Sequence, residues 1–492
     1  MIEHSLRIEF CEERGLQEQL REALIGSILG GRFVPDETLP SCRSLSEQLG
    51  VSRNTVSLVY EGLRDEGYLI SRPRSGYFVD PRYQPTSAVP IEVQEGEVAP
   101  DWGSRLRLHP SELVAVTKPA RWMQYRYPFI YGQPDSAHFP MEQWRAAARQ
   151  VMGGCRDHEW LYDQVDQDNP MLIEQLRTRV LPKRGILAGA DEILLTLGTQ
   201  NALSLIAQLL IGAGTRIGVE NPGFREAVNT FTLQQAQVVP HEVDGEGIVL
   251  RSASSACDCW YVTPSHQAPT GVSMSDARRR QLLQHAERHD QFIIEDDFDS
   301  ETNIEAYPRP ALKASDGSGR VIYVSSLSKA LAPGLRLGFL VASAELVDEL
   351  RALRRLMYRH PPANIQYQMA HFLAQGHYDS FLRRYREESA RRWETLDAAL
   401  ERHLSGCVRN QSRASAFWLR APEGVDTQRL AWRAAHNGVL IEPGVHHFLD
   451  EAPARHYFRL GFHAIEEEAI VPGVRLLAEA LDKEIGRSGL TV

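Results

Sequence analysis

The sequence contains little lysine, and its charge balance lacks a basic excess. Only five of its 492 residues are lysines, namely Lys118, Lys183, Lys313, Lys329 and Lys483. Any chemistry that needs a lysine amine must therefore use one of these positions. The formal net charge of −10 excludes a globally basic nucleic-acid-binding protein, but it leaves room for a local basic surface.

Cysteines and long apolar runs are also scarce. The six cysteines are scattered, and only Cys257 and Cys259 lie close together; this spacing fits neither a zinc site nor a disulfide framework. No run approaches the ~20 apolar residues of a membrane span, and the first residues do not have the pattern of a signal peptide. We therefore expect a cytoplasmic protein with no membrane partner and no metal site, built of two or three domains.

Residues 1–80 predict a winged helix-turn-helix domain. Apolar residues recur at helical spacing over 16–29, and Ser41 and Ser52 are each placed to cap a short helix. The turn between those two helices contains Gly50, and two short helices joined by such a turn form a helix-turn-helix. Residues 68–79 predict the two strands of a wing.

The rest of the chain predicts a linker followed by an α/β domain. Residues 81–120 are rich in Pro, Gly and small polar residues, which is typical of a linker. From 121 to 492, short apolar strands alternate with helical stretches, which indicates a mostly parallel sheet. The predicted strands are 193–197, 216–219, 260–262, 292–294, 322–324 and 339–341. From about Asp379 the pattern is mixed, which predicts a smaller C-terminal α+β subdomain.

Polar residues follow several of these strands, where ligands bind in open α/β sheets. Gly198-Thr199-Gln200 follows one strand and opens a helix, and such a turn presents free N–H groups to a phosphate. Asp296 follows a second strand, where an acid can also be a solvated cap. His266 lies in a polar turn after a third strand, and it can be either a ligand or a structural histidine.

Lys329 follows a fourth strand, beside Ser326, Ser328 and Arg336. Two hydroxyls and a guanidinium around a lysine predict a phosphate pocket beside an amine. Pyridoxal 5′-phosphate needs an amine for its Schiff base, phosphate donors, and a carboxylate for its pyridine nitrogen. The strand ends supply all three, so the sequence predicts this cofactor bound to Lys329.

Four segments, NPGF, PSHQAPTG, IIEDDFDSE and SLSKALAPGLRLGF, resemble fold-type I pyridoxal-phosphate enzymes of the aminotransferase class. Together with LPSCRSLSEQLGVSRNTV, they make the chain resemble the MocR-type subfamily of GntR transcriptional regulators. The resemblance implies that Asp296 pairs with the pyridinium, that Phe224 stacks on the ring, and that Tyr162 reaches the phosphate of a neighbouring subunit. The cofactor-binding set expected in this way is Gly198, Thr199, Gln200, Phe224, His266, Asp296, Phe298, Ser326, Ser328, Lys329, Arg336 and Tyr162.

The resemblance also implies a site for the carboxylate of a bound amino compound, at Arg459, although this arginine could instead form a surface salt bridge. Two positions depart from the family pattern. Phe298 stands where a Tyr is usual and Ala268 where working aminotransferases carry Asn, so two hydrogen-bond donors to the cofactor are missing. We therefore expect a raised pKa of the internal aldimine and weak or no transamination.

The expected DNA contacts lie in the amino-terminal domain. Residues 1–80 contain nine Arg, no Lys and thirteen Asp or Glu, so the positions of the arginines matter more than the net charge. In the winged helix that the chain resembles, the positions that face the duplex correspond to Arg43, Ser52, Arg53, Asn54, Thr55, Arg72 and Arg74. A small protein-binding domain with surface arginines is the alternative.

These features lead to one main function and two alternatives. The main hypothesis is a regulator that binds operator half-sites on double-stranded DNA and senses a small amino compound through external aldimine formation at Lys329. The resemblance implies a head-to-tail, domain-swapped homodimer. The first alternative is an active aminotransferase that carries an appended DNA-binding domain, and the second is a sensor of the cofactor itself.

Overall fold

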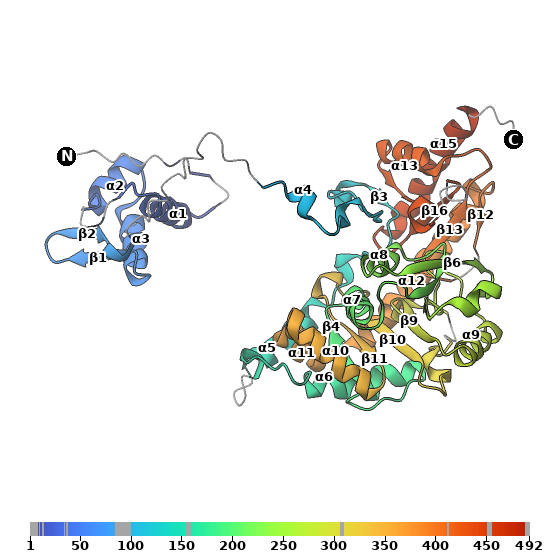
Figure 1. Cartoon of the computed structure of the whole chain (residues 1–492). Coiled ribbons are helices and arrows are strands. Elements are labelled where there is room, and N and C mark those ends of the chain that lie inside the picture. Colours follow the sequence, from blue (N-terminus) through green and yellow to red (C-terminus); the bar gives the residue numbers. More distant parts are fainter. Residues whose placement is uncertain are drawn as a thin grey trace. The chain divides into compact units, whose positions relative to one another are not determined.

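The chain divides into two compact units, Met1–Leu106 and Arg107–Val492 (Figure 1). The computed structural model describes residues 8, 10–11, 14–33, 35, 38–83, 100–153, 159–305, 309–410, 413–449 and 455–487. The division falls inside the predicted linker, 81–120, of which residues 84–99 lie outside the described residues. The predicted division into residues 1–80, 81–120 and 121–492 stays a prediction.

The amino-terminal unit is a winged helix-turn-helix, as predicted. Ser41 Oγ accepts a hydrogen bond of 3.1 Å from the Ser44 N–H, and Ser52 Oγ accepts one of 3.0 Å from the Thr55 N–H. These two caps begin the second and third helices, and Gly50 ends the second in the left-handed region at φ 66°. Its elements are α1 (Leu16–Leu29), α2 (Cys42–Leu49), α3 (Arg53–Asp65), β1 (Leu69–Arg72) and β2 (Gly76–Val79).

One apolar core joins the helices of this unit to its wing. Leu24 of α1, Leu45 of α2 and Val56 of α3 are all buried in the same cluster as Val79 of β2. The strands β1 and β2 pair antiparallel, and Arg74 in the turn between them adopts φ 66°. The wing is therefore fixed to the helices, while its turn stays exposed.

An eight-stranded mixed sheet forms the centre of the second unit (Figure 1). The strand order is β4-β11-β10-β9-β8-β5-β6-β7; the five strands from β10 to β6 are parallel to one another, while β4–β11, β11–β10 and β6–β7 pair antiparallel. The strands are β4 (Ile193–Thr196), β5 (Arg216–Asn221), β6 (Gln237–Asp244), β7 (Gly247–Ile248), β8 (Cys259–Val262), β9 (Phe292–Asp296), β10 (Val321–Ser326) and β11 (Gly338–Val341). Each of the six predicted strands is present.

Helices cover both faces of this sheet. Leu195 and Phe339 belong to one apolar cluster, whereas their neighbours on the same strands, Leu194 and Leu340, belong to another. Strands buried on both faces are nearly continuous apolar runs, which explains why the sequence revealed them. The short helix α4 (Trp102–Arg105) belongs to the first unit. The helices of the second unit outside the C-terminal region are α5 (Met141–Gly153), α6 (Pro170–Gln175), α7 (Thr199–Leu210), α8 (Arg225–Leu233), α9 (Asp276–Arg288), α10 (Ala344–Met357) and α11 (Ala363–Ala374).

The smaller subdomain contains a segment that the sequence analysis did not assign to it. The short strand β3 (Tyr127–Pro128) pairs in parallel with β14 (Val439–Leu440), so it lies among the C-terminal elements (Figure 1). Tyr127 and Phe129 are buried in the core of this subdomain. Its other elements are α12 (His377–His403), β12 (Val408–Arg409), β13 (Ala416–Arg420), α13 (Thr427–His436), β15 (Glu442–Pro443), β16 (Tyr457–Gly461) and α15 (Glu467–Arg487).

Membrane-spanning helices and metal-ligand clusters are both absent from the described ranges. No helix there is both long and apolar enough to cross a bilayer. In the same part of the chain, no group of three or more His, Cys, Asp or Glu side chains is arranged to hold a metal ion.

Candidate functional site

A cavity of about 340 Å³ lies at the carboxyl ends of the parallel strands. The predicted residues that line it are Thr199, Phe224, Asp296, Phe298, Lys329, Arg336 and Arg459. These residues come from five separate segments, four at or after the ends of β4, β5, β9 and β10 in the large sheet and the fifth in β16 of the small subdomain. Residues far apart in the sequence therefore meet at one place, as the strand-end argument predicts.

Lys329 lines this cavity with its amine among charged and aromatic groups. Its Nζ is 3.6 Å from Asp299 Oδ1 and 3.8 Å from the centre of the Phe298 ring, and it donates a hydrogen bond to the Tyr131 hydroxyl. Burial lowers the pKa of Lys329 to about 8, with the Asp299 carboxylate opposing the shift and Arg459 adding to it. A sizeable fraction of the amine is therefore neutral near pH 8, the form in which a lysine is a nucleophile.

Asp296 has one oxygen bound and one free among the described residues. Its Oδ2 accepts a hydrogen bond of 2.9 Å from the Tyr261 hydroxyl, whereas its buried Oδ1 has no hydrogen-bond partner there. Burial raises the pKa of Asp296 to about 7, although the Tyr261 hydrogen bond and the nearby Lys329 lower it. A buried carboxylate oxygen without a partner is costly, so this atom is suited to a protonated ring nitrogen.

The turn before α7 is shaped for an anion. Gly198 adopts φ 84°, and α7 begins directly after it without a side-chain cap, so the first N–H groups of the helix are not capped by a side chain. Arg336 Nη2 donates to the Leu197 carbonyl at 2.9 Å. A Cβ on Gly198 would lie 3.4 Å from the Arg336 guanidinium, so the arginine lies against the turn.

Gly338 permits this close arrangement, and we expect Gly338→Ala to disrupt it. An added Cβ would lie 2.8 Å from Gly198 Cα and 2.9 Å from the Ser325 carbonyl oxygen, both backbone atoms. Overpacking of this kind costs about 1–3 kcal/mol. We expect a lower melting temperature and weaker binding of pyridoxal 5′-phosphate. Gly334→Ala is the matched control, because nothing lies within 4 Å of its added Cβ; equal effects of both changes would contradict this account.

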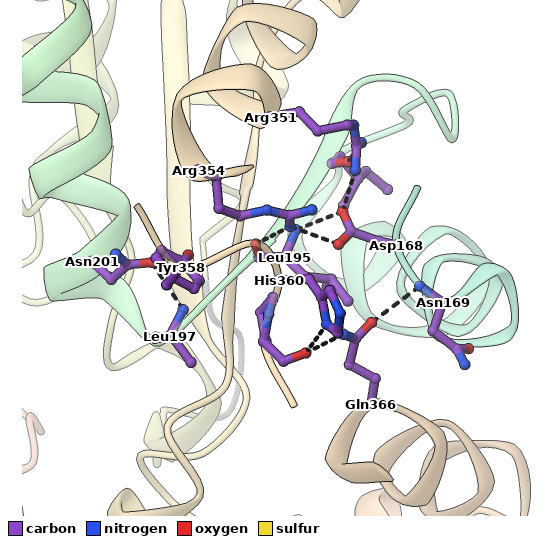
Figure 2. Close-up of polar contacts among 12 residues, drawn as sticks. Asp168, Asn169, Leu195, Leu197, Asn201, Arg351, Arg354, Tyr358, His360 and Gln366 are labelled. Carbon is purple, nitrogen blue, oxygen red and sulfur yellow. Dashed lines mark hydrogen bonds and ion pairs between the residues drawn. The ribbon is translucent and has the colours of Figure 1, made fainter. Parts of the chain in front are cut away.

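A buried ionic network holds the strand that leads into the same turn. Figure 2 shows Arg351 and Arg354 of α10 directed at the carboxylate of Asp168, which receives hydrogen bonds of 2.8 and 2.7 Å from them. Asp168 Oδ2 also accepts from the Leu195 N–H at 3.1 Å, and Arg354 Nη1 donates to the Leu195 carbonyl at 2.7 Å. The network therefore fixes the end of β4, shortly before the turn at Gly198.

Two predicted serines and one glutamine direct their side chains elsewhere. Ser326 Oγ accepts from the backbone N–H groups of Ser328 and Lys329, at 3.3 and 3.2 Å, and so shapes the loop that carries the lysine. Ser328 Oγ donates to the Leu337 carbonyl at 3.1 Å. Gln200 Nε2 donates to Thr230 Oγ1 at 2.7 Å. Their predicted contacts with a phosphate stay predictions.

His266 and Tyr162 lie outside the lining of the main cavity. The His266 ring is buried, its Nδ1 is 3.6 Å from Asp299 Oδ2, and it lines a small pocket next to Phe298 and Arg459. Tyr162 is 70% exposed, so its predicted role at a neighbouring subunit stays a prediction.

Arg459 is buried, so it is not a surface salt-bridge partner. Its Nη2 lies 2.5 Å from Glu442 Oε1, and the same oxygen is 2.7 Å from His447 Nε2. Burial opposes the charge of Glu442, but Arg459 and His447 outweigh it and hold the pKa of this carboxyl far below its usual range. The Arg459 guanidinium also stacks over the Tyr131 ring, 4.0 Å from its centre.

Sequence reasoning missed Tyr131, Asp299 and Glu442 at this site. Asp299 was recognisable in principle, because it follows Asp296 in the acidic segment after β9. Burial opposes its charge, but Lys329, His266 and Ser415 outweigh this and lower the pKa of Asp299. Tyr131 and Glu442 carry no local signal, since each approaches the lysine or arginine only through tertiary packing.

The predicted arginine and asparagine contacts with DNA lie on exposed positions of the amino-terminal unit, whereas Thr55 is half-buried. Arg43 is in the first turn of α2, and Arg53 and Asn54 are in the first turn of α3; all three are exposed. Arg72 and Arg74 are exposed in the wing. The Arg43 side chain is 79% exposed, and its Nε donates to Glu47 at 3.0 Å.

Comparisons with known proteins agree with this two-part architecture. Residues 131–463 match the family model for aminotransferase class I and II, and residues 16–79 match that for bacterial regulatory proteins of the gntR family. The transcriptional regulator TauR of Rhodobacter capsulatus is 39% identical over 95% of this chain and 96% of its own length. The chain belongs to the MocR-type regulators of the GntR superfamily.

Other relatives of this MocR-type chain support both halves. The probable rhizopine catabolism regulatory protein MocR of Rhizobium meliloti is 33% identical, over 94% of this chain and 93% of its own length. An archaeal alanine:glyoxylate aminotransferase superposes with a TM-score of 0.72 at 24% identity, covering 78% of this chain and 100% of that one. The fold of the second unit is therefore that of fold-type I aminotransferases, a family that depends on pyridoxal 5′-phosphate.

The residues present fit this cofactor. Another structural neighbour, the α-aminoadipate aminotransferase LysN of Thermus thermophilus, was solved with N-(5′-phosphopyridoxyl)-L-leucine; it is 25% identical with a TM-score of 0.71 and covers 78% of this chain and 99% of that one. In this MocR-type chain, the unpartnered Asp296 Oδ1, the lysine with a lowered pKa and the turn at Gly198 supply the three required groups. Asp296 would hold the ring nitrogen, and Thr199 and Arg336 the phosphate.

Proposed function

We propose that this transcriptional regulator holds pyridoxal 5′-phosphate on Lys329 and senses a small amino compound there. The observation that carries the proposal is the single cavity that joins a nucleophilic lysine, an unpartnered buried carboxylate oxygen and an anion-binding turn. When bound, the cofactor would supply an aldehyde carbon for a Schiff base. Lys329 would hold the cofactor through its amine, and it would take up the two protons of the effector amine when the effector replaces it.

Release of Lys329 would alter the charges around it. The contacts that the Lys329 amine makes with Tyr131 and Asp299 would then change. An acidic group on the effector would also compete with Glu442 for Arg459. Such differential contacts are what a ligand needs to shift an equilibrium between two states. We propose that this shift changes how the winged helices bind operator half-sites, with a head-to-tail homodimer supplying two of them.

Two lining residues favour a sensor over a catalyst. Ala268 and Phe298 both line the cavity, and neither side chain carries a hydrogen-bond donor. We therefore propose weak or no transamination, in line with the missing donors. An active aminotransferase is the alternative, and a rapid exchange of amino groups between ordinary amino acids and oxo acids would support it.

The test combines absorbance with DNA binding. The purified protein, loaded with pyridoxal 5′-phosphate, is scanned against a panel of amines and amino acids, and each is then added to a gel shift on the promoter region of its own gene. We expect the compound that shifts the absorbance to change the affinity for DNA by roughly 5–150-fold. An unchanged affinity with every compound that shifts the absorbance would refute the proposal.

The DNA assignment predicts that Arg43→Ala weakens site preference by roughly 1–3 kcal/mol. The exposed ion pair with Glu47 contributes little, so the guanidinium is free to leave it for a guanine edge. Gel shifts on the specific site and on unrelated DNA measure the difference. Arg21→Ala is the control, because Arg21 lies on α1 and binds Glu66. Unchanged preference in Arg43→Ala would refute the assignment.

A further inference from the structure

Lys118 also lines the cavity, although it comes from the segment that the sequence analysis assigned to the linker. It lies twelve residues beyond the division between the two units, and Val116 lines the cavity beside it. Two hydrogen bonds join the backbone of this segment to side chains of α8: Asn229 Nδ2 donates to the Val114 carbonyl at 2.7 Å, and the Val116 N–H donates to Glu226 Oε1 at 3.4 Å. The position of Lys118 is therefore defined by the fold.

The Lys118 amine is half-buried, and it forms no hydrogen bond or ion pair with any residue that the structure describes. It lies beside Gly132, where an added Cβ would be 3.8 Å from Nζ. Burial lowers the pKa of Lys118, and the charges that act on it besides are those of Glu442, Arg459 and Glu226. A partly desolvated cation without a close partner is a binding group for an anion.

The charge of Arg459, in contrast, is already offset. Its guanidinium is paired with Glu442, which in turn contacts His447. A carboxylate that approaches Arg459 alone meets a guanidinium that is already paired with Glu442, and the negative charge of Glu442 repels it. Recognition of an acid at this end of the cavity therefore calls for a second cation. The Lys118 amine lies beside Gly132, the residue after Tyr131, and the Arg459 guanidinium stacks over the Tyr131 ring.

We propose that Lys118 is a second binding residue, with Arg459, for the acidic group of the effector. The ligand class is a primary amine that carries a carboxylate or a sulfonate, whose oxygens can accept hydrogen bonds from both cations. This inference rests on the proposed function, because it requires the amine of the same ligand to react at Lys329. It also places the effector in direct contact with the segment that connects to the DNA-binding unit.

The phosphate of the cofactor is the other anion that could bind Lys118. Lys118 lies beside Gly132, next to the Tyr131 ring that Arg459 covers, whereas Arg336 lies against the Gly198 turn. A cofactor phosphate at the Gly198 turn already has Arg336 and the N–H groups of α7. The geometry therefore favours the acid of the effector, and the test below separates the two anions.

The test uses the full chain loaded with pyridoxal 5′-phosphate, as wild type, Lys118→Met and Lys118→Arg. Absorbance titrations use 3-aminopropanoate, 4-aminobutanoate and 2-aminoethanesulfonate as acid-bearing probes and propylamine as the uncharged probe. We expect Lys118→Met to weaken acid-bearing amines relative to propylamine by about tenfold or more, and Lys118→Arg to restore most of the difference. Lys183→Met is the matched control, because this exposed lysine binds Asp379 on α12.

Two results would overturn the proposal. One is that Lys118→Met leaves the ratio of acid to propylamine affinity unchanged. The other is that the wild type binds propylamine more tightly than all three acids. If Lys118 binds the cofactor phosphate instead, Lys118→Met would weaken retention of the cofactor and leave that ratio unchanged. A wild type without Schiff-base absorbance would remove the proposed function together with this inference, whereas normal absorbance with an unchanged ratio removes only the inference.

Hydrogen exchange gives a second readout. In the wild type, the acid-bearing probe that binds best should slow exchange of the backbone amides of residues 113–118, and propylamine should not. In Lys118→Met this protection should be lost. Equal protection by both probes would show that the segment responds to the amine reaction rather than to the acid, and would contradict the proposal.

Discussion

The Lys329→Ala variant is expected to retain no covalent pyridoxyl group. After incubation with pyridoxal 5′-phosphate and reduction with borohydride, the wild type should gain the pyridoxyl mass on the peptide that contains Lys329. Its Schiff-base absorbance, near the violet edge of the visible spectrum, should disappear. In the variant both signals should be absent, because the amine that forms the Schiff base is gone. The turn at Gly198, which we propose binds the phosphate, remains in place, so the variant should still bind the cofactor weakly and reversibly.

A second lysine in the cavity makes this experiment decisive. Lys118 shares the lining with Lys329, so an adduct that survives in Lys329→Ala and maps to Lys118 would contradict the assignment. Lys183→Ala controls for unspecific labelling of exposed lysines, since Lys183 lies on the surface beside Asp379. Its adduct on Lys329 should match that of the wild type.

Asp168→Asn is expected to destabilise the second unit by about 3–5 kcal/mol, because it breaks a buried ion pair and leaves its cation uncompensated. Arg354 is completely buried, and its Nε and Nη2 already have no hydrogen-bond partner among the described residues. Arg351 would lose the same carboxylate (Figure 2). Thermal or urea unfolding, followed with a probe of the second unit, measures the change.

The control for this variant is Asp163→Asn, the same substitution in the same segment of chain. Asp163 pairs with Arg359 and His360, but its side chain is 44% exposed, so we expect a loss of less than about 1 kcal/mol. Adding Arg354→Met to Asp168→Asn should recover part of the stability, because the buried charge is then removed. Equal losses in the two single variants would refute the buried network as the cause.

Local chemistry explains why much of the fold was predictable. Two helices are capped by Ser41 and Ser52, each through a hydrogen bond to a residue three positions further on, and one helix ends at Gly50. These features depend on a few neighbouring residues only. The central strands are buried on both faces, so each is a short apolar run. The pairing of β3 with β14 was missed, because two-residue strands about 300 positions apart leave no periodic signal.

The candidate site also has residues that the sequence predicts and residues that it does not. Lys329, Asp296 and the Gly198 turn follow strands, and the parallel sheet brings strand ends together, so sequence position alone predicts their meeting. Glu442 meets Arg459 because the two are paired across β15 and β16, and Tyr131 reaches Lys329 from another part of the chain. Lys118 was assigned to a linker by composition, which does not show where a polar segment packs.

The interleaving of β3 with the C-terminal elements decides where the second unit can be cut from the whole protein. Phe129 donates its N–H to the Leu440 carbonyl and accepts from the Gly461 N–H, and the Gly473 position on α15 is filled by its ring. A fragment that starts at residue 131, where the match to the aminotransferase family begins, would lack this strand and open the small core to water. A stable fragment must start ahead of Val114, so that the strand and the tether to α8 are both retained.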